Sequence, residues 1–179
     1  MKEPNESTSA DFAASRWQAA NFEALSPSER IMLYGEAAYL LARNPLHRAY
    51  TLQDLEQRVM HPISLNQFRM YRKPSGPVAL LTWAFVSDAL HDRFQREVFD
   101  LGPEDWSSGP HLWYIDFVAP FGDGGFVIED MLTNVFPDLV GHAQRALIKS
   151  EKPFVLRSYY GVNVAWRQRR DVEGEREHG

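Results

Sequence analysis

The sequence has no cysteine among its 179 residues. Disulfide bonds, thiol nucleophiles and cysteine metal sites are therefore excluded, and the composition fits a reducing cytosol. No apolar run approaches the roughly 20 residues that a helix needs to cross a bilayer. Residues 1–15 are polar and acidic, unlike the apolar segment of a signal peptide. We expect a cytoplasmic protein with no membrane span.

Positive charge is also scarce. The net charge is −5 and no block of basic residues occurs, so we expect no nucleic-acid partner. The six histidines show no His-x-x-x-His or His-Glu-x-x-His spacing, so we expect no metal site. A Gly-x-Ser-x-Gly nucleophile elbow is absent as well.

Apolar residues make up 44% of the chain and aromatic residues 13%, enough for one domain with a large core. Composition predicts three parts: a flexible N-terminal leader at 1–25, a folded domain at 26–166 and a charged C-terminal tail at 167–179.

Hydrophobic periodicity predicts alternating helices and strands, and so an α+β fold: one mixed, mostly antiparallel sheet flanked by helices. Ser26, Pro27 and Glu29 mark the start of a helix that ends near Arg43. Its expected buried face carries Ile31, Tyr34, Ala38 and Leu41. The other predicted helices are 52–60, one after Ser87 with Leu90, Phe94 and Val98 on one face, and one with Ile128, Met131, Leu132 and Val135; the strands are 67–72, 78–86, one around Asp116, 143–148 and 153–160.

Asp116 is the most informative single residue, because it stands alone among apolar residues in a predicted strand. Leu112, Tyr114 and Val118 share its face, and the opposite face is apolar too. Such a strand is central and buried, and an ionised carboxylate there is costly unless a partner binds it. We therefore expect a functional Asp116. The alternative is a structural acid bonded to Arg48, Arg145 or backbone amides.

A glycine-rich turn, Gly122-Asp123-Gly124-Gly125, links this strand to the next helix. Amides at a helix N-terminus bind anions, and glycines let a ligand approach them. The turn lacks the Arg-x-x-Gly-x-Gly and P-loop patterns that bind larger phosphate groups. We therefore expect a small site for a single phosphate beside Gly122 and Gly124. An ordinary turn is the alternative.

Four segments together carry a resemblance to a known family. They are Asn44-Pro45-Leu46-His47-Arg48, Leu81-Thr82-Trp83-Ala84, the Glu-Asp-Trp-Ser-Ser-Gly run at 104–109, and Ile-Asp-Phe-Val-Ala-Pro-Phe-Gly-Asp-Gly-Gly at 115–125. In order and spacing, from about Arg43 to Arg145, they resemble the toxin-activating lysine acyltransferases. The resemblance implies an N-acetyltransferase-like fold. It also implies transfer of a fatty acyl group from acyl carrier protein to internal lysines of an RTX-type protoxin by a cytoplasmic homodimer.

The resemblance also implies roles for particular residues. His47 and Asp116 fall on the catalytic positions, and Asn44, Trp83 and Arg145 are candidate substrate-binding residues beside Gly122 and Gly124. No cofactor is expected to bind tightly; the donor is the acyl-phosphopantetheine of acyl carrier protein. Basic residues near the matched motifs supply an expected contact surface for that acidic partner: Arg48, Arg69, Arg72, Lys73 and Arg145.

Lysine acylation needs a base, because an ε-amine has a pKa of about 10.4 and attacks only when deprotonated. A carboxylate bonded to one nitrogen of His47 would make the other nitrogen more basic. By itself, without Asp116, His47 is more readily interpreted as an exposed or capping histidine than as a catalytic one. Two other functions stay open: a non-catalytic family member that binds acyl carrier protein or a partner, and an acyl-CoA-dependent N-acyltransferase of another substrate.

Overall fold

The computed structural model describes residues 25–98, 100–146 and 154–166. They fall into two compact units. The first comprises the described residues of Met1–Thr82 and Asp116–Gly124, and the second those of Trp83–Ile115 and Gly125–Gly179. The predicted charged tail and nearly all of the predicted leader lie outside the described residues.

Side-chain capping starts both helical segments of the first unit. Helix α2 (Pro27–Leu41) begins with a capping box, in which Ser26 and Glu29 satisfy each other's backbone amides. Thr51 and Asp54 form the same motif at α3 (Leu52–Asp54). The chain then continues as a π-helical stretch, η2 (Leu55–Met60), and as α4 (His61–Ser64). The two helix starts predicted from sequence are therefore confirmed.

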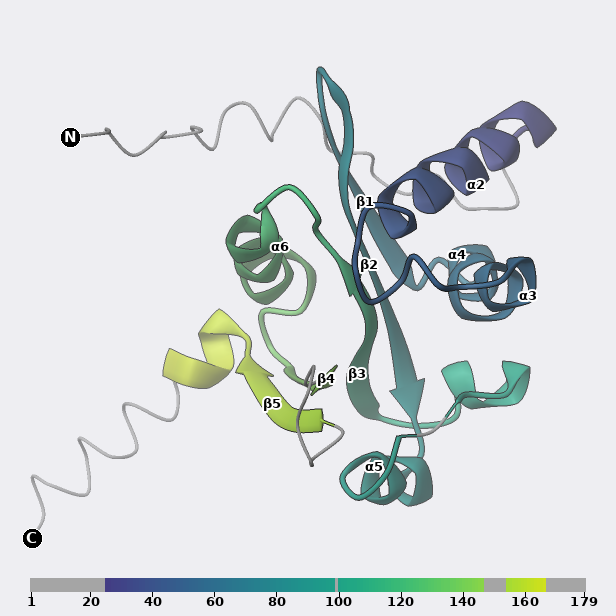
Figure 1. The fold of residues 1–179 in the computed structure, drawn as a ribbon. Coiled ribbons are helices and arrows are strands. Elements are labelled where there is room, and N and C mark those ends of the chain that lie inside the picture. The colour runs from purple at the N-terminus through teal and green to yellow at the C-terminus, as the bar shows by residue number, and fades with distance from the viewer. Residues whose placement is uncertain (1–24, 99, 147–153, 167–179) are drawn as a thin grey trace, which may run out of the picture. The chain divides into compact units, whose positions relative to one another are not determined.

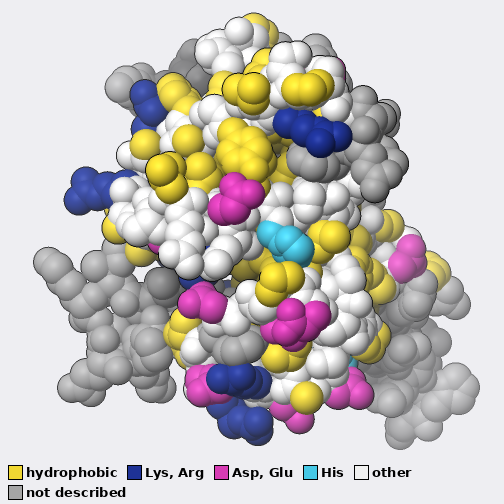
Figure 2. Space-filling model, turned by 90° about the vertical axis from the view of Figure 1, so that its right-hand side faces the viewer, with side chains coloured by type: hydrophobic (Ala, Val, Ile, Leu, Met, Phe, Trp, Pro, Cys, Tyr) yellow, Lys and Arg dark blue, Asp and Glu magenta, His cyan; other side chains and the backbone are white. Residues whose placement is uncertain are grey.

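The predicted buried face of α2 is wrong for Ile31 and Ala38, which are exposed, whereas the half-buried Tyr34 does pack against the core. Ile31 is 71% exposed, whereas Leu33 and Ala37 are fully buried. Leu41 is the buried member that the prediction shares with the structure. Apolar residues occur nearly all round this helix, so two faces satisfied the helical period. Some apolar side chains of α2 therefore remain on the surface, and Figure 2 shows hydrophobic side chains in the upper part of the view.

Strands β1 (Phe68–Lys73) and β2 (Gly76–Val86) form an antiparallel hairpin. Gly76 begins β2 with a φ of +123°, a conformation that side chains disfavour. The helical segments lie beside this hairpin (Figure 1), and their apolar residues form one core with it. The members of that core from the helices are Leu33, Ala37, Leu40, Leu41, Val59, Met60 and Ile63, and those from the strands are Phe68, Met70, Leu80 and Val118.

The second unit contains α5 (Asp88–Phe94) and the short 3-10 helix η3 (Pro103–Trp106). Ser87 caps α5 as predicted, but the helix ends at Phe94, and Val98 is 62% exposed rather than part of the buried face. Helix α6 (Gly124–Asp130) continues as the π-helical η4 (Met131–Val135). Strands β4 (Val140–Ala146) and β5 (Phe154–Tyr160) follow.

The five strands form one sheet in the order β1-β2-β3-β4-β5, where β3 is His111–Val118. β1 and β2 are antiparallel, as are β4 and β5, whereas β3 pairs with β4 in parallel. The predicted α+β class with one mixed sheet and flanking helices is therefore confirmed. None of the helices described is long and apolar enough to cross a membrane.

Three histidines meet in the second unit. The ring of His91 stacks on His111 at 4.1 Å and meets the edge of His142 at 5.0 Å, while Trp113 donates its indole proton to His91 Nδ1. Among the described residues, no group of histidine and acidic side chains is arranged to hold a metal ion. Burial, followed by the nearby His111, lowers the pKa of His91. Burial, His91 and His111 lower the pKa of His142.

These lowered pKa values make stability depend on pH. An unfolded histidine takes up its proton near pH 6.5, whereas His91 and His142 in the folded protein do so at lower pH. The neutral rings therefore contribute stability that is fully present above about pH 6.5. It is lost as the pH falls from about 6.5 through the lowered pKa values of the folded state.

We expect the melting temperature to be lower at about pH 5.5 than at about pH 7.5, with these rings accounting for part of the difference. Both rings are partly exposed, and solvent screening keeps the effect small. The His142→Gln variant should show a smaller difference between the two pH values. His61→Gln, outside the cluster, is the matched control and should keep the full difference; equal behaviour of the two variants would contradict the assignment.

Candidate active site

A tight turn after α2 presents His47. The Asn44 side-chain oxygen accepts a hydrogen bond from the Leu46 amide at 3.0 Å, and the Asn44 carbonyl accepts from the amides of His47 and Arg48. Two residues further along, the Tyr50 amide donates to the His47 carbonyl at 2.9 Å. Asparagine favours such turns because its side chain bonds the backbone two residues ahead. Asn44 thus shapes the turn that carries His47.

Strand β3 supplies the carboxylate. Asp116 is 2% exposed, in agreement with the predicted burial. Its backbone amide donates to Thr82 Oγ1 on β2 at 3.1 Å, and Thr82 is itself fully buried. This hydrogen bond fixes the backbone of Asp116 at the point from which its side chain projects.

His47 and Asp116 meet as the sequence predicted. Nε2 of His47 lies 3.2 Å from Oδ1 of Asp116, and His47 is only 8% exposed. Because an ionised carboxylate can only accept hydrogen bonds, this contact places the proton of a neutral imidazole on Nε2 and leaves the lone pair on Nδ1. Buried between the turn and β3, His47 is neither exposed nor a helix cap.

Tyr50 binds the same carboxylate oxygen, with its hydroxyl 2.9 Å from Oδ1 of Asp116. Its ring meets the edge of the His47 imidazole at a centroid distance of 5.2 Å. Burial, followed by the charge of Asp116, raises the pKa of the Tyr50 hydroxyl well above its ordinary value. The phenol therefore stays protonated and acts as a donor at physiological pH.

Two atoms of the site are buried without a hydrogen-bond partner among the described residues: Nδ1 of His47 and Oδ2 of Asp116. Buried polar atoms are normally satisfied, and exceptions concentrate where a ligand or water completes the bonding. The free nitrogen is the one that the tautomer argument leaves with a lone pair. A substrate N–H group is a suitable partner for it.

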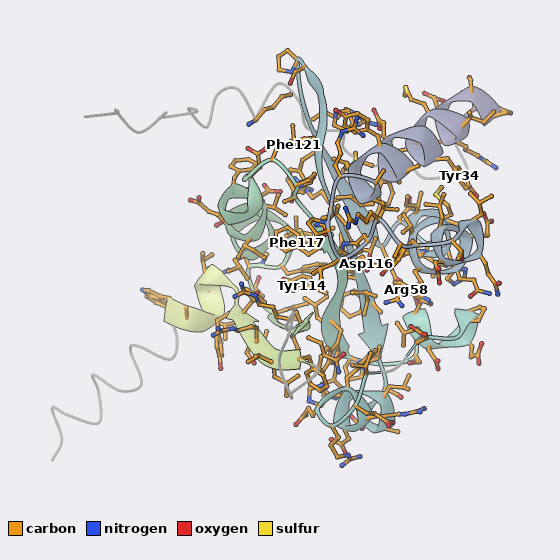
Figure 3. All side chains as sticks on the ribbon, viewed as in Figure 1. Tyr34, Arg58, Tyr114, Asp116, Phe117 and Phe121 are labelled. Carbon is orange, nitrogen blue, oxygen red and sulfur yellow. The ribbon has the colours of Figure 1, made fainter. Side chains whose placement is uncertain are left out.

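Helical residues flank the site. The guanidinium of Arg58, on η2, lies 5.2 Å from the centre of the Tyr50 ring. Figure 3 shows Asp116 on β3 and Arg58 on the neighbouring helical segment of the same unit. Unlike Tyr50, Tyr34 on α2 donates its hydroxyl hydrogen bond to Glu56, at 3.1 Å and 3.2 Å from the two carboxylate oxygens.

The glycine-rich turn has the backbone that its sequence suggests, but it also holds an ion pair. Gly122 has a φ of +95°, and a side chain at Gly124 would meet the Phe117 ring at 3.4 Å. Asp123, between them, bonds Lys73 Nζ at 2.6 Å. The sequence did not indicate this pairing, which commits Lys73 to the turn.

Other predicted residues have varied surroundings. Trp83 is buried in the second unit, where its ring meets the edge of Phe136 at 5.2 Å. Arg145 lies exposed on β4 of that unit. Arg72 is paired with Glu36 within the first unit, whereas Arg48 is exposed.

Two residues of the site were missed by the sequence reasoning, Tyr50 and Thr82. Tyr50 follows His47 by three residues in the same turn, and that spacing was a usable signal because i and i+3 side chains share a face when the chain is helical or tightly turned. Thr82 lay within a matched segment. Its role depends on the pairing of distant strands, for which the local sequence carries no signal.

The site thus contains the groups of an acid–base centre, and comparison with known proteins identifies the family. Residues 26–160 match the HlyC family, described as the RTX toxin acyltransferase family. The chain belongs to this family.

Individual relatives are similar over about 105–113 residues. Lysine-acyltransferase RtxC of Vibrio cholerae serotype O1 is 36% identical, over 58% of this chain and 69% of the relative. RTX-I toxin-activating lysine-acyltransferase ApxIC of Actinobacillus pleuropneumoniae is 35% identical over 62% and 64% of the two chains. Protein-lysine myristoyltransferase HlyC of Escherichia coli is 34% identical over 63% and 66%. The chain thus spans about two thirds of the length of these relatives.

A solved structure from Corynebacterium glutamicum, described as histone acetyltransferase HPA2 and related acetyltransferase, aligns with a TM-score of 0.41 and 11% identity. The alignment covers 76% of this chain and 93% of that one.

Proposed function

We propose that the protein transfers a fatty acyl group from acyl carrier protein to internal lysine side chains of an RTX-type protoxin. The supporting observation is the buried contact between His47 Nε2 and Asp116 Oδ1, which leaves Nδ1 without a partner among the described residues. Membership of the RTX toxin acyltransferase family and the names of the relatives support the choice of lysine as acceptor.

His47 acts as the general base in this proposal. Nδ1 takes a proton from the lysine nitrogen, which attacks the thioester carbonyl of the donor. The new C–N bond forms as the C–S bond breaks, and the departing sulfur takes a proton, so the products are an amide and a thiol. Asp116 holds the imidazole and stabilises its protonated form during the step.

Mass spectrometry of an RTX-type protoxin co-expressed with this protein tests the reaction. We expect fatty acyl groups on a few internal lysines, and none when the protein is omitted. An unmodified protoxin beside a folded, soluble protein would favour the non-catalytic alternative. Acylation of other substrates from acyl-CoA would favour the second alternative.

We also propose that the donor is acyl carrier protein, bound through opposite charges, with the phosphopantetheine phosphate beside Gly122 and Gly124. The turn lacks an arginine to clamp a pyrophosphate, and Lys73 is the basic group joined to it. Arg48 is exposed next to His47 and is suited to contact an acidic partner. We also propose that the protein is a cytoplasmic homodimer, as the family resemblance implies. Sedimentation measurements test whether it is a dimer.

Transfer from acyl carrier protein should weaken by about tenfold or more as salt rises from about 0.05 M to about 0.5 M, because salt screens the encounter of opposite charges. Arg48→Glu should reduce transfer at low salt and flatten the salt dependence. Arg30→Glu, at the opposite end of α2, is the matched control. Equal or better use of acyl-CoA, with transfer independent of salt, would rule out this donor.

A second variant tests the phosphate position within the same prediction. A side chain at Gly125 would meet no atom within 4 Å, so Gly125→Val adds bulk at the start of α6, beside the proposed phosphate position, without pressing on a neighbour. Gly124→Val would press on the Phe117 ring and is less informative. We expect Gly125→Val to raise the KM for the acylated carrier protein and to leave the melting temperature nearly unchanged.

A further inference from the structure

Two donors converge on one oxygen of Asp116. The Tyr50 hydroxyl lies 2.9 Å from Oδ1, and His47 Nε2 lies 3.2 Å from the same atom. Oδ2, the other oxygen of the carboxylate, is buried and has no hydrogen-bond partner among the described residues. The shorter contact belongs to Tyr50, which is half-buried and whose backbone amide donates to the His47 carbonyl in the turn that carries both residues.

The local charges keep Tyr50 a donor. Asp116 faces it from β3, Asp54 from α3 and Arg58 from η2. The two carboxylates and burial all favour the neutral phenol, and Arg58 opposes them only in part. Since the hydroxyl has a single proton, that proton is committed to Oδ1.

We propose that Tyr50 is a positioning residue for the catalytic pair, because its hydrogen bond fixes the Asp116 carboxylate and limits how strongly that carboxylate draws the imidazole proton. This inference rests on the proposed function, in which His47 is the base. Without the phenol, the carboxylate can turn about its Cβ–Cγ bond and present either oxygen to Nε2. The direction of Nδ1 then becomes less well defined.

The phenol also sets the strength of the base. A hydrogen bond from Tyr50 spreads part of the negative charge of Asp116, so that the carboxylate stabilises the protonated imidazole less. Removing the hydroxyl concentrates that charge on the contact with His47. The imidazole then holds its proton more tightly, and a higher pH is needed to free Nδ1.

The substrate-free protein provides the first test. In Tyr50→Phe, the midpoint of the His47 titration followed by NMR of the imidazole nitrogens should move to higher pH by about half a unit to one unit. Replacing Tyr50 by 3-fluorotyrosine, whose hydroxyl is a stronger donor, should move the midpoint the other way. Titrations that match the wild type in both variants would overturn the inference.

Kinetics provide the second test. In Tyr50→Phe, the acidic limb of the pH profile of kcat/KM should move to higher pH by the same amount, and kcat at the plateau should fall by roughly tenfold while the KM values stay nearly constant. Tyr34→Phe removes a hydroxyl bonded to a different carboxylate, that of Glu56, in the same unit. This control should leave both the titration and the pH profile unchanged.

The two tests separate the inference from the function on which it rests. If Tyr50→Phe shifts the His47 titration but the protein modifies no lysine, the role of Tyr50 stands and the acyltransferase proposal is removed. If the protein does acylate lysine but Tyr50→Phe keeps the wild-type pH profile, the acyltransferase proposal stands and the role of Tyr50 is removed. Thermal melts show that each variant is folded under the conditions of measurement. If Tyr50→Phe melts at too low a temperature, the 3-fluorotyrosine variant, which keeps every contact of the native ring, provides the test.

Discussion

The His47→Ala variant is expected to lose acyl transfer by a factor of roughly 10²–10⁴, the usual contribution of a positioned general base. The reason is that Nδ1, which has no hydrogen-bond partner among the described residues, belongs to the imidazole whose other nitrogen, Nε2, contacts Asp116, and alanine offers no substitute for it. Transfer rates to a lysine-containing segment of the acceptor, measured with saturating donor, give the effect directly.

Stability serves as the control for that result. His47 is 8% exposed and packs against the Tyr50 ring, so its removal should cost about 1–2 kcal/mol rather than nothing. His47→Gln fills more of the same space and should be equally inactive but closer to native stability. His61→Ala removes a histidine elsewhere in the first unit and should stay active. Near-native transfer by folded His47→Gln would exclude the base assignment.

Asp116→Asn should produce a similar loss, of roughly 10²–10⁴ in rate, with a smaller effect on stability. The amide oxygen can still accept from both Tyr50 and His47, so the shape of the site survives. A neutral side chain no longer stabilises a protonated imidazole, and that stabilisation is needed only while the reaction proceeds. Initial rates and thermal melts of the same preparation separate the two effects.

Two further variants sharpen this prediction. Asp116→Leu removes the acceptor, which leaves the Tyr50 hydroxyl and His47 Nε2 without a bond; each such loss costs about 1–3 kcal/mol. We therefore expect this variant to be less stable than the wild type. Asp130→Asn alters another buried acid, which is 1% exposed, and should retain transfer activity. A fully active Asp116→Asn would make the carboxylate structural.

Local signals in the sequence predicted much of the fold. The start of α2 could be predicted because Ser26 and Glu29 cap each other within four residues, and the start of α3 could be predicted from Thr51. The burial of Asp116 followed from apolar residues on both faces of one strand. These features depend on near neighbours, so the sequence alone contains their cause.

Features that depend on distant parts of the chain were less accessible. Ile31 and Leu33 are both apolar, and which of them is buried depends on what packs against α2. The Lys73–Asp123 pair joins residues 50 positions apart, and the Tyr50–Asp116 contact joins residues 66 positions apart. Spacing within a motif cannot reveal such pairs, since they exist only once the sheet and turns have assembled.

The distance along the chain between His47 and Asp116 has a practical consequence. The two residues are separated by 69 positions, and the strand that carries Asp116 is anchored to Thr82, 34 positions before it. A proteolytic fragment that ends before β3 contains the histidine without its carboxylate. In a denaturant titration, enzymatic activity should therefore disappear no later than the sheet itself, which makes turnover a sensitive reporter of native structure in screens for stabilised variants.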